Sequence, residues 1–179
     1  LTRWPEYAEC TDMADILLAD CERTYTLIEN MFAAIARCFT SRRVNIGMDE
    51  AHFIGLGKYL DLHGYCNRFE ILKKHLARVG EIAAKYGFRP MMWSDMFFRL
   101  MSGGEYYCAS GAIPQAVKDL VPKNVSLIYW AYFSTTRSHY DQMFRATRPS
   151  HNPALFAGGA WSWSGFTPAN RVPTRAKRA

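Results

Sequence analysis

Val44-Asn45-Ile46-Gly47-Met48, followed at once by Asp49-Glu50, is the stretch from which the fold of this chain can be worked out. A short apolar run bounded by polar residues is typical of a strand that is buried on both faces. Three more runs of four or five residues have the same character, at positions 90–93, 125–129 and 154–158. The sequence therefore predicts four short strands.

Helices are predicted between these strands. Apolar residues recur at three- and four-residue spacing across positions 22–39 and 68–86, and Asn67 is the expected N-cap of the second helix. Shorter helices are expected from Pro114 and across 138–147. Because helices alternate with strands, we expect βαβ units and a parallel sheet that is either doubly wound or part of a barrel.

Composition and charge exclude several classes of protein. The chain has 179 residues, of which 49% are hydrophobic and 15% aromatic, so it can bury a sizeable core and is not disordered. It contains no long uncharged apolar stretch, which excludes a membrane-spanning helix and a membrane partner. The net charge is 22 − 16 = +6, but four basic residues lie in segment 171–179, which leaves 18 − 16 = +2 for the rest. We interpret 171–179 as a solvated basic tail and not as a nucleic-acid site.

The cysteines and histidines indicate neither a disulfide framework nor a metal site. The five cysteines are widely spaced and include no C-x-x-C pair, and the five histidines fall at no metal-binding spacing. We therefore expect reduced thiols, no cofactor and a cytoplasmic location. The start, Leu1-Thr2-Arg3-Trp4, has no signal-peptide character.

Polar and aromatic side chains follow every predicted strand. Chemistry in parallel α/β folds collects at the carboxyl ends of strands. Aromatic faces stack on pyranose rings and a carboxyl group can act as a general acid, so this combination indicates a sugar site. The segments concerned are Asp49-Glu50-Ala51-His52, Trp93-Ser94-Asp95, Tyr129-Trp130-Ala131-Tyr132 and Trp161-Ser162-Trp163.

These segments carry a family resemblance. The stretch from Asn45 to His52 resembles the Asp-Glu signature of glycoside hydrolase family 20, the β-N-acetylhexosaminidases, and is closest to a bacterial subgroup. The resemblance covers about residues 1–170 and continues, in the order of the family, through Gly55-Leu56-Gly57-Lys58-Tyr59-Leu60, Met91-Met92-Trp93-Ser94-Asp95-Met96 and Phe156-Ala157-Gly158-Gly159-Ala160-Trp161.

The resemblance implies a fold. Family members have a (β/α)8 TIM-barrel catalytic domain, and a complete barrel needs roughly 200 or more residues. Residues 1–170 are therefore expected to form a partial barrel of about four central to late βα units, with 171–179 as a tail. An open barrel exposes two sheet edges, so we expect the isolated chain to be marginally folded. The oligomeric state stays open.

The resemblance also implies a mechanism, the retaining and substrate-assisted hydrolysis of terminal β-linked N-acetylglucosamine or N-acetylgalactosamine from a glycan. The acetamido oxygen of the substrate would attack the anomeric carbon. Glu50 would be the general acid and base, and Asp49 would orient the acetamido N–H and offset the developing positive charge. No metal or organic cofactor is implied.

Other residues are expected to bind the sugar. Tyr129 matches the residue that donates to the acetamido oxygen, and Trp93 matches a wall of the acetamido pocket. Ala131 departs from the family, because an acid that binds a ring hydroxyl is expected there. Trp161 and Trp163 are expected to form further walls or a stacking platform. Contacts with the sugar are also expected from Asp95, Tyr132 and His52. Trp130 is interpreted as a core residue.

Several alternatives stay open from the sequence. The chain could be a non-catalytic sugar-binding remnant or an inactive fragment of such an enzyme, or a glycoside hydrolase with an ordinary nucleophile. Asp49-Glu50 could only open a helix, where the dipole favours acids. Asp95 could likewise only cap the helix after its strand.

Overall fold

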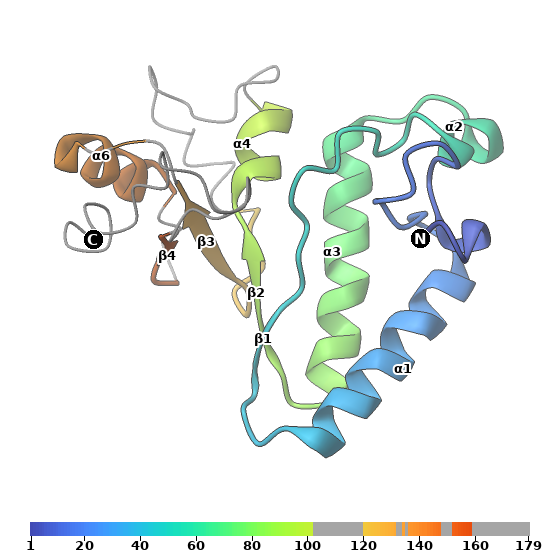
Figure 1. Ribbon diagram of the computed structural model, residues 1–179, viewed down its shortest axis with the longest axis horizontal. Helices are drawn as coiled ribbons and strands as arrows, with labels where there is room; N and C mark the ends of the chain where they lie inside the picture. Colours follow the sequence, from blue (N-terminus) through green and yellow to red (C-terminus); the bar gives the residue numbers. More distant parts are fainter. Residues whose placement is uncertain (102–119, 132–133, 135, 148–151, 159–179) are drawn as a thin grey trace, which may run out of the picture. The chain divides into compact units, whose positions relative to one another are not determined.

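The computed structural model describes residues 1–101, 120–131, 134, 136–147 and 152–158 (Figure 1). The expected helix from Pro114 lies outside this part, as do Tyr132, Trp161, Trp163 and the tail 171–179. The elements, in chain order, are η1 (Pro5–Tyr7), α1 (Glu22–Cys38), β1 (Arg43–Asn45), α2 (Lys58–His63), α3 (Arg68–Lys85), β2 (Arg89–Trp93), α4 (Asp95–Met101), β3 (Ser126–Trp130), α6 (Arg137–Thr147) and β4 (Leu155–Ala157).

The strands form one sheet in the order β1-β2-β3-β4. β1 is parallel to β2 in the register Arg43↔Arg89, and β3 is parallel to β4 in the register Ile128↔Leu155. The prediction of an α/β fold with parallel strands is therefore confirmed. All four predicted strands are present, and the helices α2 and α4 were not predicted.

The chain divides into two compact units, Leu1–Met91 and Met92–Ala179. In the first unit, α1 and α3 lie side by side (Figure 1) and their apolar stripes share one core. Val44, Ile46 and Met48 pack against this core from β1 and the segment after it. Each large apolar side chain that is fully buried contributes roughly 1.5–3 kcal/mol. The core consists of Tyr25, Ile28, Phe32, Val79, Ile82, Ala83 and Phe88.

Both ends of α3 follow from its sequence. The Asn67 side chain is the N-cap and accepts from the backbone N–H of Phe69 at 2.9 Å and of Glu70 at 3.4 Å. Gly87 ends the helix with φ +72°, a conformation that glycine adopts without a steric penalty. The predicted N-cap is therefore confirmed.

The second unit has a smaller aromatic core between β3, β4 and α6. Tyr129, Ala131, Tyr140 and Met143 are buried together, and Phe156 of β4 packs against them. No helix in the described part of the chain is both long enough and apolar enough to cross a bilayer.

Candidate functional site

The backbone changes conformation at the end of β1. Ile46 N–H still donates to the Met91 carbonyl at 2.8 Å, but Gly47 has φ +73°, Met48 φ +72° and Glu50 φ +46°. The strand therefore ends at Asn45, and the predicted strand 44–48 is too long because left-handed residues cannot continue a ladder. Met48 and Glu50 each hold a conformation that costs about 1–2 kcal/mol for a residue with a Cβ atom.

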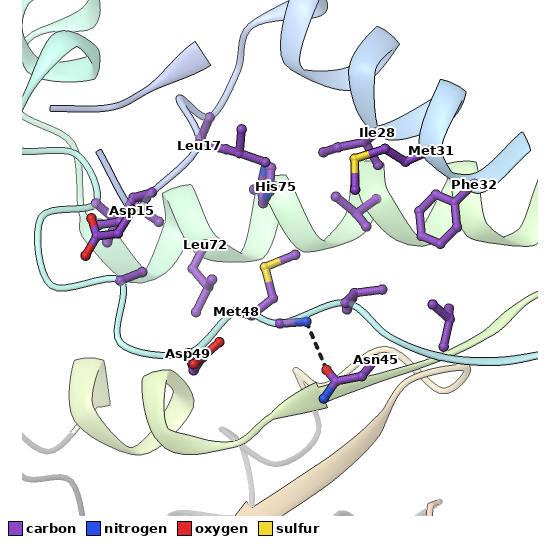
Figure 2. A pocket seen from close by; sticks show the side chains of 18 of the residues that line it. Asp15, Leu17, Ile28, Met31, Phe32, Asn45, Met48, Asp49, Leu72 and His75 are labelled. Carbon is purple, nitrogen blue, oxygen red and sulfur yellow. Dashed lines mark hydrogen bonds between the residues drawn. The ribbon is translucent and has the colours of Figure 1, made fainter. Parts of the chain in front are cut away.

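Contacts on both sides hold this loop in place. Asn45 Oδ1 accepts from the N–H of Gly47 at 2.9 Å, which is the dashed line in Figure 2. On the other side, Arg68 of α3 donates from Nη2 to the His52 carbonyl at 2.5 Å and from Nε to the Ile54 carbonyl at 3.1 Å. Segment 46–54 is therefore tied to β1 and to α3. Arg68 was not singled out in the sequence, because nothing in its spacing indicates a contact 14 to 16 residues away.

The loop exposes both carboxylates of the Asp49-Glu50 pair. In an extended strand, neighbouring side chains point to opposite faces. The left-handed backbone at Met48 and Glu50 removes this alternation, so the two carboxylates are not held on opposite faces. Met48 packs against the core of α1 and α3, whereas Asp49 folds back over Gly47, with Oδ1 3.6 Å from the position of a Cβ there. The alternative in which the pair opens a helix is wrong, because the next helix, α2, begins at Lys58.

The glycines of the Gly55-Leu56-Gly57 segment have structural roles. Gly55 has φ +72° and lies against Ile71 of α3. The N–H of Gly57 donates to the buried Glu9 Oε1 at 3.0 Å, and a Cβ at Gly57 would overlap the Glu9 carbonyl oxygen. This part of the motif fixes the turn before α2 against the N-terminal segment.

A cavity of about 360 Å³ lies beside the Asp49 loop within the first unit. Figure 2 shows its walls, which come from α1, from α3, from segment 44–51 and from residues near Leu17. The lining is mainly apolar, with Asp15, Asn45, Asp49 and His75 as its polar members. The sequence did not predict this cavity, because its walls are distant in the chain.

Trp93, Asp95 and Tyr129 belong to the second unit. Trp93 is half-buried at the end of β2. Asp95 is the first residue of α4, is 4% exposed, and accepts from the indole N–H of Trp130 at 3.2 Å. Trp130 is half-buried and not simply a core residue, since its indole N–H binds a buried carboxylate.

Tyr129 is 2% exposed and its ring lies against Phe144 and Phe156. Its hydroxyl is 3.0 Å from His139 Nε2 on α6, a contact that the sequence did not predict. Ala131, where the family pattern has an acid, is 4% exposed in the same aromatic core. An alanine at this place contributes apolar packing and no hydrogen bond.

The structure thus places the predicted residues in two groups. Asp49, Glu50 and His52 share one loop of the first unit, and Trp93, Asp95 and Tyr129 lie at the ends of β2 and β3. Within the described residues, no three His, Cys, Asp or Glu side chains are grouped in a way that could hold a metal ion.

Comparisons with known proteins give similar solved structures. No family model and no curated protein matches the chain. The GH20 β-N-acetylhexosaminidase from Streptomyces coelicolor A3(2) is 18% identical, with a TM-score of 0.49 over 89% of this chain and 30% of its own length. The Streptomyces plicatus N-acetyl-β-hexosaminidase in complex with Thio-NAglucal is 17% identical, with a TM-score of 0.48 over 89% and 30% of the two chains.

An inactive mutant of the GH20 exo-β-N-acetylglucosaminidase from Vibrio harveyi is 13% identical, with a TM-score of 0.48 over 83% of this chain and 20% of its own. This chain spans less than a third of the length of each of these three proteins.

Proposed function

We propose that this chain is part of a (β/α)8 glycoside hydrolase domain that removes terminal β-linked N-acetylglucosamine or N-acetylgalactosamine from glycans. The observation that carries the proposal is the Asp49-Glu50 pair itself. It stands in a family 20 signature, is exposed, and follows a strand on a loop whose backbone is left-handed at Met48 and Glu50. Backbone strain of this kind is concentrated at functional sites.

The two carboxylates have different roles in the proposed reaction. Glu50 protonates the glycosidic oxygen as the bond to the anomeric carbon breaks, and the acetamido oxygen of the substrate forms the new bond to that carbon. Glu50 then removes a proton from the water that opens the oxazolinium-like intermediate. Asp49 accepts from the acetamido N–H and offsets the positive charge that develops on it.

The sugar-binding roles rest on the sequence resemblance and are part of the proposal. Trp93 forms a wall of the acetamido pocket, and Tyr129 donates its hydroxyl proton to the acetamido oxygen. The remaining sugar contacts come from Asp95, Tyr132, Trp161, Trp163 and His52.

One observation favours a second candidate, a sugar-binding protein without turnover. Ala131 replaces the acid that is expected to hold a ring hydroxyl, and it is buried among aromatic side chains. A site that lacks this contact holds the sugar less firmly, and an orientation error of about 1 Å can cost a hundredfold in rate.

The experiment is hydrolysis of an aryl β-N-acetylglucosaminide by the chain and its variants. Glu50→Gln should lower the rate by a factor of about 10²–10⁴ and Asp49→Asn by about 10²–10³. Asp61→Asn, which removes an exposed carboxylate on α2, is the matched control and should leave the rate unchanged.

Two further ligands separate the alternatives. Binding of a thiazoline mimic of the intermediate without turnover would favour the sugar-binding protein. Efficient cleavage of an aryl glucoside, which has no acetamido group, would contradict substrate assistance and indicate an ordinary nucleophile.

A further inference from the structure

The loop directly after Glu50 exposes two large apolar side chains. Phe53 is 37% exposed and Leu56 is 43% exposed, whereas Ala51 and Ile54, which alternate with them, are buried. Glu50, Phe53 and Leu56 are thus the exposed members of a pattern that repeats every three residues. Single exposed apolar residues are common on protein surfaces, but a group of them beside a candidate site indicates contact with a ligand.

Tight turns explain this spacing. The N–H of Ile54 donates to the Ala51 carbonyl at 3.3 Å, and the N–H of Leu56 donates to the Phe53 carbonyl at 2.9 Å. Both bonds join residues three apart, and in a backbone of this kind side chains three positions apart lie on one side. Phe53 and Leu56 therefore share the side of the loop that also exposes Glu50.

The backbone is held so that Phe53 stays at the surface. Arg68 donates to the carbonyls of His52 and Ile54, which are the residues on either side of Phe53. These bonds are made to backbone groups, so they fix the position of Phe53 without burying its ring. An exposed apolar ring forgoes the stabilisation that burial gives, and contact with a ligand recovers it.

This surface offers apolar contact and no side-chain hydrogen bond. Segment 53–57, Phe-Ile-Gly-Leu-Gly, has no polar side chain. The next residue, Lys58, donates from Nζ to the Pro5 carbonyl. A sugar ring has a face of C–H groups and a rim of hydroxyl groups. Burial of that face against Phe53 and Leu56 removes apolar surface from water, while the hydroxyl groups stay hydrated.

We propose that Phe53 and Leu56 form the subsite for the leaving group, and that this group is a sugar bound through its C–H face, with no hydroxyl recognised. The proposal rests on the proposed function, in which Glu50 protonates the glycosidic oxygen. Asp49, which binds the acetamido group of the cleaved sugar, folds back over Gly47 before the pair, whereas Phe53 and Leu56 come after it. The glycosidic oxygen at Glu50 joins the two sugars, so the surface after Glu50 receives the leaving one.

The test compares four β-N-acetylglucosaminides of primary alcohols, whose leaving groups have similar intrinsic reactivity. The leaving groups are methanol, cyclohexylmethanol, and glucose or galactose linked through O6. In the unaltered chain, kcat/KM should be about tenfold higher for the three ring-containing substrates than for the methyl glycoside, because they add apolar contact. Glucose and galactose, which differ in the configuration of one hydroxyl, should give nearly equal values. No gain over the methyl glycoside, or a difference of about tenfold or more between glucose and galactose, would overturn the proposal.

Variants locate the contact. Phe53→Ala should remove most of the gain for the ring-containing substrates, so that their kcat/KM approaches that of the methyl glycoside. Leu56→Ala should act in the same direction and is the second variant if Phe53→Ala does not fold. Phe39→Ala is the matched control, because Phe39 is 62% exposed at the opposite end of β1 and its loss should keep the full gain. A gain that persists in both Phe53→Ala and Leu56→Ala, or that disappears in Phe39→Ala, would overturn the proposal.

A binding measurement separates this inference from the proposed function. No hydrolysis of any of the four substrates would contradict the proposed function. Calorimetric titration of the methyl and cyclohexylmethyl thioglycosides, in which sulfur replaces the glycosidic oxygen, would still test the subsite. The cyclohexylmethyl compound should bind about tenfold more tightly than the methyl compound, and Phe53→Ala should abolish the difference. Equal affinities in the unaltered chain would overturn the proposal.

Discussion

Met48 offers a direct test of the strained loop after β1, because its backbone and its side chain have opposite effects on stability. Its φ of +72° costs about 1–2 kcal/mol for any residue with a Cβ atom, whereas its side chain packs against the core of α1 and α3. Met48→Ala loses the packing and keeps the strain, so it should destabilise by about 1–2 kcal/mol at this half-buried position.

Met48→Gly loses the same packing but relieves the strain. Glycine also loses about 0.4–1 kcal/mol more conformational entropy on folding than alanine. The relief is larger than this loss, so Met48→Gly should be more stable than Met48→Ala by about 0.5–1 kcal/mol. This order of stability is the reverse of the order expected inside a helix or a strand, where a glycine variant is less stable than an alanine variant.

The free energies of unfolding are measured by urea denaturation followed by circular dichroism. Ile35 is the control position, because it is half-buried against the same core but lies inside α1. There the glycine variant should be less stable than the alanine variant by about 1 kcal/mol. The reasoning is refuted if Met48 shows the same order as Ile35.

Three further perturbations test other parts of the fold. Gly57→Ala should destabilise by about 2–4 kcal/mol, measured by urea denaturation, because the new Cβ overlaps the Glu9 carbonyl and displaces the N–H that binds the Glu9 carboxylate. Trp130→Phe should cost about 1–2 kcal/mol in the same assay, because it removes a donor from the buried Asp95 carboxylate. Burial lowers the pKa of His75 from 6.5 to about 4, so the unfolded chain takes up the proton at a higher pH than the folded chain does. Stability should therefore fall by up to about 3 kcal/mol as the pH drops from 7 to 4. This loss is measured as a shift of the urea midpoint between pH 7 and pH 4.

Each of these perturbations has a matched control in the chain. A Cβ atom added at Gly64 meets no atom within 4 Å. Gly64→Ala should therefore lose only the stability that a φ of +72° costs an alanine, which is less than the loss expected for Gly57→Ala. Trp4→Phe alters an indole that is 59% exposed and should leave the urea midpoint unchanged. The pH-dependent loss assigned to His75 should disappear in His75→Phe and persist in His63→Phe. Equal losses of stability in Gly57→Ala and Gly64→Ala would contradict the Gly57 contact with Glu9. A loss of stability in Trp4→Phe as large as that in Trp130→Phe would contradict the Trp130–Asp95 contact. A pH profile that is the same in His75→Phe as in the unaltered chain would contradict the role of His75.

Helices α1 and α3 were predictable because their apolar stripes are local. The spacing of apolar residues gave 22–39 and 68–86, and the structure has α1 and α3 within one residue of these bounds. Strand β1 ended earlier than predicted because Gly47 and Met48 are left-handed. Apolar side chains indicate that a segment is buried, but they do not indicate the sign of φ. The apolar pattern therefore continues to Met48, although the hydrogen-bonded strand ends at Asn45.

Less of the candidate site could be predicted. The Asp49-Glu50 pair was identified because its motif is contiguous in the sequence. The contact of Trp130 with Asp95 joins residues 35 apart, and the bond from Gly57 to Glu9 joins residues 48 apart. Such contacts depend on how the elements pack, and no periodicity in the sequence encodes them.

The tethers of the Asp49-Glu50 loop explain how two exposed carboxylates can have a defined position. Met48 is anchored in the core before the pair, and Arg68 holds the backbone at His52 after it. A site is preorganised when neighbouring groups fix its backbone, and these two contacts hold the backbone on either side of the pair. Because both side chains are exposed, Asp49→Asn and Glu50→Gln change charge with little change in packing. Loss of activity in these two variants with unchanged stability would therefore report on chemistry, whereas variants of Met48 or Arg68 would change the position of the same carboxylates without altering their charge.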